Sequence, residues 1–335
     1  MASVPWMLSD SKDEAFRTQF EPHRRAITAH SYRMLGSIQD AEEIAQESLL
    51  RAWQRRGELR STDSARAWLY KIATNASLDR LKQRRRRALP HHVAPPADPE
   101  QPFGPPAHEG LWIEPAPDAL LEAPDDPEER PEARASMSES ISLAFITALQ
   151  LLPPKQRAAL LLVDVLGWRP HETAELLKTT EASVNSLLQR ARKSLETREV
   201  QPQPPAGPED AALLQRFMAT WESGDLDAFT ALLAEDAVLS MPPQPQWYAG
   251  RAAIRRFFER LLRAEPRRYR FVPLQANGLP GFALYARPVG GSSYVAAGIT
   301  LLSLRQGLIS QVTRFSMPRL FPLFGLPERL PEDGP

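Results

Sequence analysis

Residues 40–53, DAEEIAQESLLRAW, decide the fold of the first part of this 335-residue chain. Apolar and small residues recur in this stretch at the 3.6-residue period of a helix, so one side of the helix packs into a core. The opposite side carries Glu42, Glu43, Gln46, Glu47 and Leu50. The stretch therefore predicts an amphipathic helix whose acidic, solvent-facing side also carries one leucine.

A second helix is predicted over residues 64–84, with Trp68 in the core. Its polar side carries Tyr70, Lys71, Thr74 and Asn75. The helix runs into four consecutive arginines at 84–87. Such a face suits a polyanion, because arginines neutralise phosphates and aromatic rings stack on unpaired bases. The alternative is a solvated helix end favoured by the helix dipole, and the arginine run alone does not decide between the two.

Residues 141–198 predict a second all-helical piece. Pro153 and Pro154 start one helix, Gly167 ends it, and Pro170 opens a short one. Thr180 can then cap a final, longer helix. A short helix, a tight turn and a longer helix form the helix-turn-helix arrangement, which is typical of DNA-binding proteins.

The third piece changes from a helical to a strand period. Helices are expected near residues 210–222, 226–234 and 250–264. Strands are expected at 237–241, 270–276, 282–287, 294–304 and 308–315, with turns at Asn277-Gly278, Gly290-Gly291 and Gln306-Gly307. Helices followed by an antiparallel meander predict an α+β domain.

The formal net charge of zero is a cancellation between segments. Residues 1–87 carry +6, residues 88–136 carry −9, and the two later segments, 137–200 and 201–335, are nearly neutral. Residues 88–136 also hold 12 of the 33 prolines, which predicts a linker that cannot bury enough surface to fold. Its apolar residues, Leu111 to Ile113 with Leu120 and Leu121, are expected to dock on a folded part of the chain.

Composition excludes several classes of site. The chain has no cysteine and only six scattered histidines, so we expect no disulfide, no metal site and no cofactor. The N-terminus lacks the basic and apolar segments of a leader, and no stretch of about eighteen uncharged apolar residues occurs. We therefore expect a cytoplasmic protein without a membrane partner.

Residues 40–53 and 67–87 closely resemble region 2 of the extracytoplasmic-function sigma factors of bacterial RNA polymerase. LPPKQR at 152–157 and VNSLLQRAR at 184–192 resemble region 4 of the same family. The resemblance implies that the protein binds core RNA polymerase through the clamp helices of its beta and beta-prime subunits. The residues implied in that contact are Asp40, Glu43, Gln46, Glu47 and Leu50.

In the family, region 2 melts promoter DNA and reads the −10 element, and region 4 reads the −35 element. The residues implied in DNA binding by region 2 are Tyr70, Lys71, Asn75, Arg80, Lys82, Arg84, Arg85, Arg86 and Arg87. Those in region 4 are Thr180, Ser183, Asn185, Ser186, Gln189 and Arg190. The commoner family pattern has a lysine where this chain has Asn185 and an arginine where it has Leu187. With fewer positive charges, this helix alone is expected to bind DNA weakly. His171 is expected to be a bystander.

Residues 209–318 are similar to the SnoaL-like branch of the NTF2-like fold, a curved, cone-shaped sheet wrapped by helices around a pocket. Candidate pocket residues are Trp221, Trp247, Tyr248, Phe257 and Tyr285, although such aromatics are more often core. Enzymatic relatives of this fold need an acid or base on the pocket wall, and the strand candidates contain no acidic residue. Glu259, on a predicted helix, is the one candidate for such an acid or base. We therefore expect no catalytic residue and no enzyme, but a domain that binds a small molecule or another part of the chain.

The sequence thus predicts a multidomain chain with two all-α sigma domains and an α+β cone. The expected boundaries are region 2 at 11–87, an acidic linker at 88–136, region 4 at 137–199, a second linker at 200–208, the SnoaL-like domain at 209–318 and a C-terminal tail at 319–335. The expected function is promoter-specific transcription initiation, with the C-terminal domain regulating activity in cis. The alternatives are a regulator that binds operators through the helix-turn-helix alone, and a DNA-binding regulator fused to a SnoaL-like enzyme or ligand-sensing domain.

Overall fold

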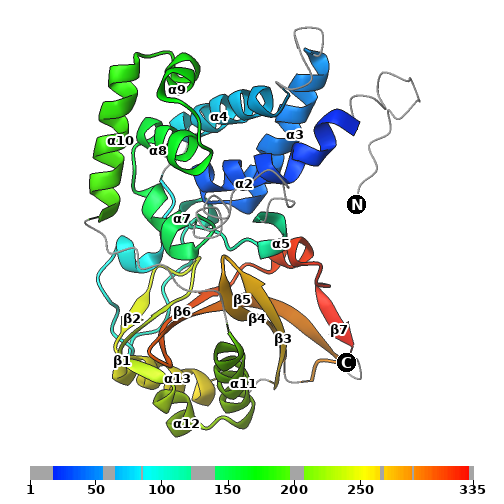
Figure 1. The fold of residues 1–335 in the computed structure, drawn as a ribbon. Coiled ribbons are helices and arrows are strands. Elements are labelled where there is room, and N and C mark those ends of the chain that lie inside the picture. Colours follow the sequence, from blue (N-terminus) through cyan, green and yellow to red (C-terminus); the bar gives the residue numbers. More distant parts are fainter. Residues whose placement is uncertain are drawn as a thin grey trace. The chain divides into compact units, whose positions relative to one another are not determined.

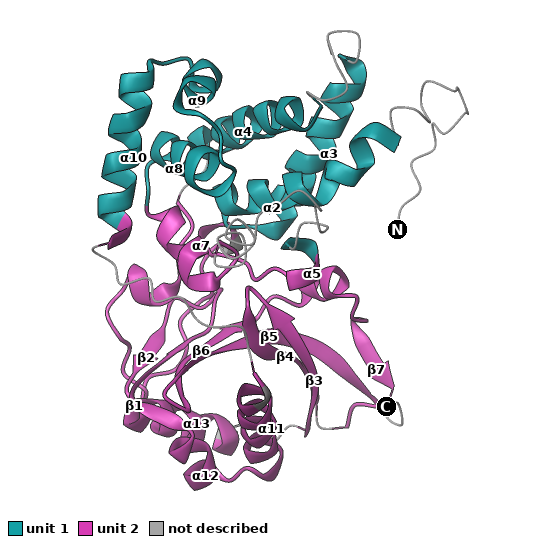
Figure 2. Cartoon of the chain, in the orientation of Figure 1, with its two compact units in different colours: residues 1–84, 120–129, 152–194 teal, residues 85–119, 130–151, 195–335 magenta. Residues whose placement is uncertain are grey.

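A computed structural model describes residues 18–55, 65–83, 86–121, 140–196, 207–264, 268–288 and 290–331. The chain divides into two compact units, shown in different colours in Figure 2. Unit 1 comprises residues 1–84, 120–129 and 152–194, and unit 2 comprises residues 85–119, 130–151 and 195–335. The expected combination of helical sigma-like parts and an α+β domain is confirmed.

The first part of unit 1 is a group of three helices (Figure 1). After the short 3₁₀ turn η1 (Glu21–His23) come α2 (Arg24–Leu35), α3 (Ile38–Gln54) and α4 (Ala65–Gln83). Gly36 ends α2 in the left-handed region, and the Ser37 side chain caps α3 by accepting from Asp40 N. The period predicted for α3 is confirmed, because Ala41, Ile44, Ala45, Ser48, Leu49 and Ala52 are buried.

The second part of unit 1 is the predicted helix-turn-helix. It comprises α8 (Pro154–Leu160), the π-helical turn η6 (Leu161–Val165), α9 (Pro170–Leu177) and α10 (Glu181–Glu196). Lys178 makes the turn after α9 with a positive φ of 50°, and Thr180 Oγ1 accepts from Ser183 N at 3.2 Å. The predicted cap of α10 is therefore present. The short helix α5 (Asp118–Leu121) lies earlier in the chain.

Unit 2 is built on a seven-stranded sheet. The helices α11 (Pro208–Ser223), α12 (Leu226–Ala231) and α13 (Arg251–Ala264) accompany it. The strands are β1 (Leu233–Ser240), β2 (Trp247–Ala249), β3 (Arg268–Ala276), β4 (Leu279–Arg287), β5 (Ser293–Arg305), β6 (Leu308–Phe315) and β7 (Arg329–Pro331). Their order is β2-β1-β6-β5-β4-β3, with β7 paired to β5, and only the β1–β6 pair is parallel.

Two tight hairpins fix the register of the meander. Asn277 and Gly278 join β3 to β4, and Gln306 and Gly307 join β5 to β6. All four residues have positive φ, as a two-residue hairpin of the primed type requires. Two of the three predicted turns are therefore confirmed; the third, Gly290-Gly291, follows Val289, which lies outside the described residues.

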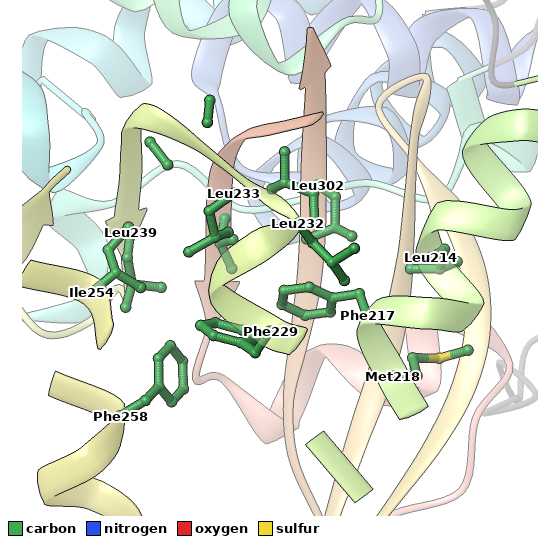
Figure 3. Close-up of a cluster of buried hydrophobic side chains, with 14 of the residues drawn as sticks. Leu214, Phe217, Met218, Phe229, Leu232, Leu233, Leu239, Ile254, Phe258 and Leu302 are labelled. Carbon is green, nitrogen blue, oxygen red and sulfur yellow. The ribbon is translucent and has the colours of Figure 1, made fainter. Parts of the chain in front are cut away.

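The helices of unit 2 fill one side of the curved sheet with aromatic side chains. Phe217 of α11 lies 5.3 Å from Phe229 of α12, and Phe229 lies 4.7 Å from Phe258 of α13, between ring centroids. Figure 3 shows these rings together with buried leucines of the same cluster. Phe282 and Leu302 of the sheet belong to the same cluster. The inside of the cone is therefore a packed hydrophobic core.

Residues 88–119, predicted to lie in a linker, are ordered against the sheet of unit 2. Ala88 forms a bridge with Trp112, and Pro117 forms one with Ala276. Trp112 and Ile113 are buried, as expected for a docking segment. The difference from the prediction has a physical reason, because Asn277 and Trp247 of the α+β domain satisfy backbone groups that this segment alone leaves unpaired. The chain also forms short 3₁₀ turns at η4 (Pro90–His92) and η5 (Glu109–Leu111).

Two further segments differ from the prediction. Helix α7 (Leu143–Gln150), expected with the helix-turn-helix, belongs to unit 2. Part of the expected C-terminal tail is structured, because η7 (Pro318–Phe324) buries Leu320 and Phe321, and β7 pairs with β5. A short apolar segment with two prolines has no period from which this pairing can be predicted.

Candidate polymerase and DNA interfaces

The outward face of α3 carries an exposed leucine among polar side chains. Leu50 is 46% exposed, and Glu43 and Gln46 on the same face are also exposed. Glu47 is half-buried and pairs with Arg51 at 2.6 Å. Burial raises the pKa of neighbouring Glu42, and Arg24 partly opposes that rise. The face therefore offers an apolar anchor within an acidic surround, the form of a polar-rimmed docking patch.

Asp40 differs from the rest of this predicted contact set. It is buried, and its carboxylate accepts from Arg80 at 3.2 Å. Arg80 also pairs with Glu43 at 3.0 Å, so one predicted DNA-binding residue joins two predicted polymerase-binding residues. Arg80 therefore ties α4 to α3, and its charge is shared with two carboxylates.

The other described basic residues at the end of α4 and after it differ in exposure. Lys82 is exposed and pairs with Asp79 at 2.8 Å. The hydrogen bond from Lys82 and its positive charge lower the pKa of Asp79. Arg86 is exposed, whereas Arg87 is buried and donates to Trp112 O at 2.7 Å. Arg84 and Arg85 lie outside the described residues. Arg87 therefore anchors the segment that follows region 2 instead of lying on an exposed basic surface.

Tyr70, predicted on the solvent side of α4, is 2% exposed. Its ring packs edge to face against His30 of α2 at 5.3 Å and against Trp168 at 6.5 Å. Thr74, one turn further on, is buried and lies 2.8 Å from His30 Nε2 through its Oγ1. The helix is thus buried on a second side, because Trp168 and α2 cover the face that the local period assigns to solvent.

The remaining α4 predictions have mixed outcomes. Asn75 is exposed, and its side chain donates to Lys71 O at 2.9 Å. Lys71 is half-buried. Trp68, predicted in the core, is also half-buried, and its ring lies 6.2 Å from that of Phe20. Of the described α4 residues that were predicted to contact DNA, Asn75 and Lys82 are thus exposed in this conformation.

A buried arginine joins the two halves of unit 1. The Arg157 side chain of α8 donates to Met34 O at the end of α2 and to Leu152 O at 3.1 Å. A cation at a helix C-terminus is favoured by the helix dipole and by the unpaired carbonyls there. Arg157 belongs to the LPPKQR stretch, so a residue of the region 4 motif holds region 2 in this conformation.

The interior around Tyr70 holds two buried basic groups. Burial lowers the pKa of His30 to about 3, with the charge of Arg33 as a further cause. Burial also lowers the pKa of Arg33 to about 10, while Tyr70 acts in the opposite direction. His30 is therefore a neutral imidazole near pH 7.

Helix α10 presents the predicted recognition surface. Asn185, Ser186, Gln189 and Arg190 are exposed, Ser183 is half-buried, and Val184, Leu188 and Ala191 form the buried side. Thr180 is exposed, and its hydroxyl is engaged in the cap. On another side of the helix, Arg192 forms a two-bonded ion pair with Asp164 at 2.6 and 2.9 Å. His171 is exposed on α9.

The five candidate pocket aromatics do not surround one cavity. Trp221, Tyr248 and Phe257 belong to or pack against the core cluster, where Tyr248 and Phe257 stack at 4.7 Å. Tyr285 packs against Phe321 at 5.1 Å, and its hydroxyl donates to Pro327 O. Trp247 donates from its ring to Ala94 O at 2.7 Å. Each ring therefore has a packing partner instead of lining one shared pocket.

Acidic residues of the α+β domain are engaged in ion pairs. Glu259 pairs with Arg255 at 2.9 Å. Strand β1 begins earlier than predicted and contains Glu235 and Asp236, so the expectation of strands without acidic residues is wrong. Both side chains are exposed and pair with Arg251 and Arg305, respectively. These pairs hold the carboxylates at the surface of the domain.

The described residues hold no group of three or more histidine or acidic residues that can bind a metal ion. None of their helices combines the length and hydropathy that crossing a bilayer requires.

The most informative contacts are those that sequence reasoning missed. Trp168 lies 98 residues from Tyr70, and Asn277 lies 161 residues from Ala116. No local pattern relates residues so far apart. The Asn-Gly dipeptide signals the turn but says nothing of the bonds made by the Asn277 side chain.

Three family descriptions match the chain in order. "Sigma-70 region 2" matches residues 19–87, "Sigma-70, region 4" matches residues 142–195, and "SnoaL-like domain" matches residues 214–312. The region 4 match includes both α7 and the helices α8 to α10. The region 4 match and the SnoaL-like match therefore both include residues of unit 2, which holds α7 and the α+β domain.

Whole-length relatives give the same result. The ECF RNA polymerase sigma factor SigG of Mycobacterium tuberculosis is 40% identical over 330 residues, which cover 96% of this chain and 86% of SigG. SigJ of the same organism is 30% identical over 230 residues, covering 67% of this chain and 64% of SigJ. The crystal structure of SigJ has the same fold, with a TM-score of 0.58 at 24% identity, covering 95% of this chain and 99% of that one. The chain therefore belongs to the extracytoplasmic-function sigma factors, which direct bacterial RNA polymerase to promoters, and it carries a SnoaL-like domain.

Proposed function

We propose that the exposed face of α3 binds the clamp helices of the beta and beta-prime subunits of core RNA polymerase. The observation that carries this proposal is Leu50, which is 46% exposed on a helix whose opposite side is fully packed. Exposed Glu43 and Gln46 beside it suit a basic partner, because complementary charge steers association and fixes register. Because it acts with the polymerase, we place the protein in the cytoplasm.

DNA reading is proposed for two helices. The exposed residues of α10 enter the major groove at the −35 element, where an asparagine or glutamine pairs with adenine and an arginine with guanine. Helix α4 reads the −10 element, with Tyr70 stacking on an unpaired base. Asn75, Lys82 and Arg86 are exposed and flank that helix face or follow it.

The conformation of unit 1 supports regulation in cis. Tyr70 is buried beneath Trp168, so its ring meets a base only after residues 152–194 separate from α4. The chain that leads into those residues is held in unit 2, where Asn277 accepts from Ala116 N and donates to Ile141 O. We therefore propose that the SnoaL-like domain holds the chain around Ala116 and Ile141, between α4 and residues 152–194, and acts by binding instead of catalysis.

In vitro transcription with core polymerase tests the function. We expect the full chain to produce mapped start sites that are absent with core enzyme alone. Leu50→Glu places a charge at the anchor and is expected to lower transcript yield at least tenfold. The matched control is Leu308→Glu, because Leu308 is also an exposed leucine, 39% exposed on β6 of unit 2. Equal yields from the two variants contradict the proposed polymerase contact.

A further inference from the structure

Unit 2 contains a cavity of about 300 Å³ outside the aromatic core. Ser303 of β5 and Gln311 of β6 line it, and they are partners in the strand register. Their neighbours Leu302 and Val312 belong to the aromatic core. Because successive side chains point to opposite faces of a sheet, Ser303 and Gln311 lie on the face away from that core. The cavity is therefore separate from the inside of the cone.

Helix α7 and the turn η4 form the other walls of the cavity. Leu143 and Ala148 of α7, with Leu151 directly after it, supply an apolar wall, and Leu89 and His91 come from the η4 region. None of the ten described residues that line the cavity carries a carboxylate, ammonium or guanidinium group. Its volume is at the lower end of those at which proteins hold small organic ligands. The walls thus suit a compact, uncharged and largely apolar molecule.

His91 adds an unsatisfied polar group to this lining. Its Nδ1 is buried and has no hydrogen-bond partner among the described residues. The ring is held in place by His92 at 4.1 Å and by Trp247 at 6.0 Å. Burial lowers the pKa of His91 to about 3, with the charge of His92 as a second cause, so the imidazole is neutral near pH 7. A buried polar atom without a partner is costly, and a ligand group bonded to it removes that cost.

The sheet wall offers a second hydrogen-bonding group. Gln311 Nε2 donates to Thr313 Oγ1 at 2.9 Å, which fixes the side-chain amide. Its Oε1 then remains an acceptor without a partner in the described part of the chain. Thr147 is different, because its hydroxyl already donates to Leu143 O at 2.6 Å. The polar contacts available to a ligand are therefore concentrated at His91 and the sheet.

We propose that this cavity is a binding site for an uncharged aromatic or alicyclic molecule that carries a hydroxyl group. The ring packs against Leu143 and Ala148, and the hydroxyl bonds to His91 or Gln311. A hydroxyl suits both partners, because it donates and accepts a hydrogen bond. Since α7 lies within the region 4 match and η4 follows region 2, an occupant holds both segments on the sheet.

The binding test uses the full chain and 2-naphthol, which has a flat apolar body and one hydroxyl. Isothermal titration calorimetry is expected to show saturable binding of one 2-naphthol per chain. The carboxylate 2-naphthoate, of similar shape, is expected to bind at least tenfold more weakly, because no cation lines the cavity. Two results overturn the proposal. One is the absence of saturable 2-naphthol binding, and the other is equal affinity of the chain for 2-naphthol and 2-naphthoate.

Variants locate the binding. Ala148→Phe fills the cavity and is expected to abolish binding, whereas Ala252→Phe makes the same change at an exposed position of α13 and leaves affinity unchanged. His91→Phe keeps a ring of similar size against Trp247 but removes the nitrogen, and is expected to weaken 2-naphthol at least fivefold. The His91 variant keeps the test decisive if Ala148→Phe does not fold. Unchanged affinity in His91→Phe contradicts the proposed contact.

Discussion

Tyr70 and Trp168 pack edge to face, with ring centroids 6.5 Å apart and an interplanar angle of 82°. Tyr70 belongs to α4, the helix that resembles the −10 reader, and Trp168 lies between η6 and α9. His30 covers Tyr70 from a second side. In the structure, Trp168 of residues 152–194 thus covers Tyr70 of region 2, and under the proposed mechanism promoter reading requires an open state of higher free energy.

Trp168→Ala is expected to increase core-dependent transcription. An edge-to-face pair contributes about 0.5–1.5 kcal/mol beyond its buried area. Removing it raises the population of the open state by about two- to tenfold, since 1.4 kcal/mol corresponds to a factor of ten. Transcript yield at limiting protein measures the change. Phe103→Ala is the control, because Phe103 is an exposed aromatic that packs on Phe257 within unit 2. A yield from Trp168→Ala at or below that of the control contradicts the masking role.

Asn277→Gly is expected to release the segment around Ala116 while keeping the hairpin. Glycine adopts the positive φ of 53° at this position without strain, so the turn survives. The bonds of the side chain to Ala116 N and Ile141 O are lost. Hydrogen exchange of residues 112–118 is therefore expected to accelerate at least tenfold.

Gln306→Gly is the matched control for this change. Gln306 holds the corresponding position of the second hairpin, with a φ of 54°, and its side chain is exposed. Exchange at residues 112–118 is expected to stay at the wild-type rate in this variant. Equal exchange in both variants shows that Asn277 does not hold the segment.

Local patterns predicted the elements whose partners lie close in sequence. The period of α3 follows from one buried side, and the hairpin at Gln306-Gly307 follows from the positive φ that its two residues adopt. The Thr180 cap likewise involves a donor only three residues away. In each case the interaction that fixes the structure lies within one or two turns of chain.

Contacts across long separations explain what the sequence left unpredicted. Tyr70 looks polar-facing in its own helix, and only Trp168 and His30 bury it. Composition marks residues 88–136 as unable to form a core of their own, which does not exclude docking on another domain. Arg87 also shows what local sequence does not predict. It lies in a run of arginines, yet its side chain is buried and donates to the backbone carbonyl of Trp112.

His30 is expected to make the protein acid-sensitive. Its pKa is lowered from 6.5 to about 3 in the folded state, so below pH 6.5 the unfolded chain binds a proton that the folded chain does not. Stability is then unaffected above pH 6.5 and falls as the pH decreases toward 3, by about 2 kcal/mol at pH 5. Urea unfolding of unit 1 at pH 7.5 and pH 5 measures the loss.

His30→Gln removes the titrating group and retains a hydrogen-bonding partner for Thr74 Oγ1. The variant is expected to lose less stability than the wild type between the two pH values. Parallel pH profiles for the wild type and His30→Gln show that another group controls the acid transition.

Arg190→Ala is expected to weaken binding of the polymerase complex to promoter DNA and to reduce its salt dependence. Arg190 is exposed on α10, and within the described ranges no carboxylate pairs with it. A phosphate contact by this residue adds about one unit to the slope of log affinity against log salt concentration. Arg192→Ala is the control on the same helix, because its guanidinium is already held by two bonds to Asp164. Fluorescence anisotropy of a labelled promoter fragment between 50 and 200 mM salt measures both slopes, and a larger change for Arg192→Ala than for Arg190→Ala places the DNA on a different face of the helix.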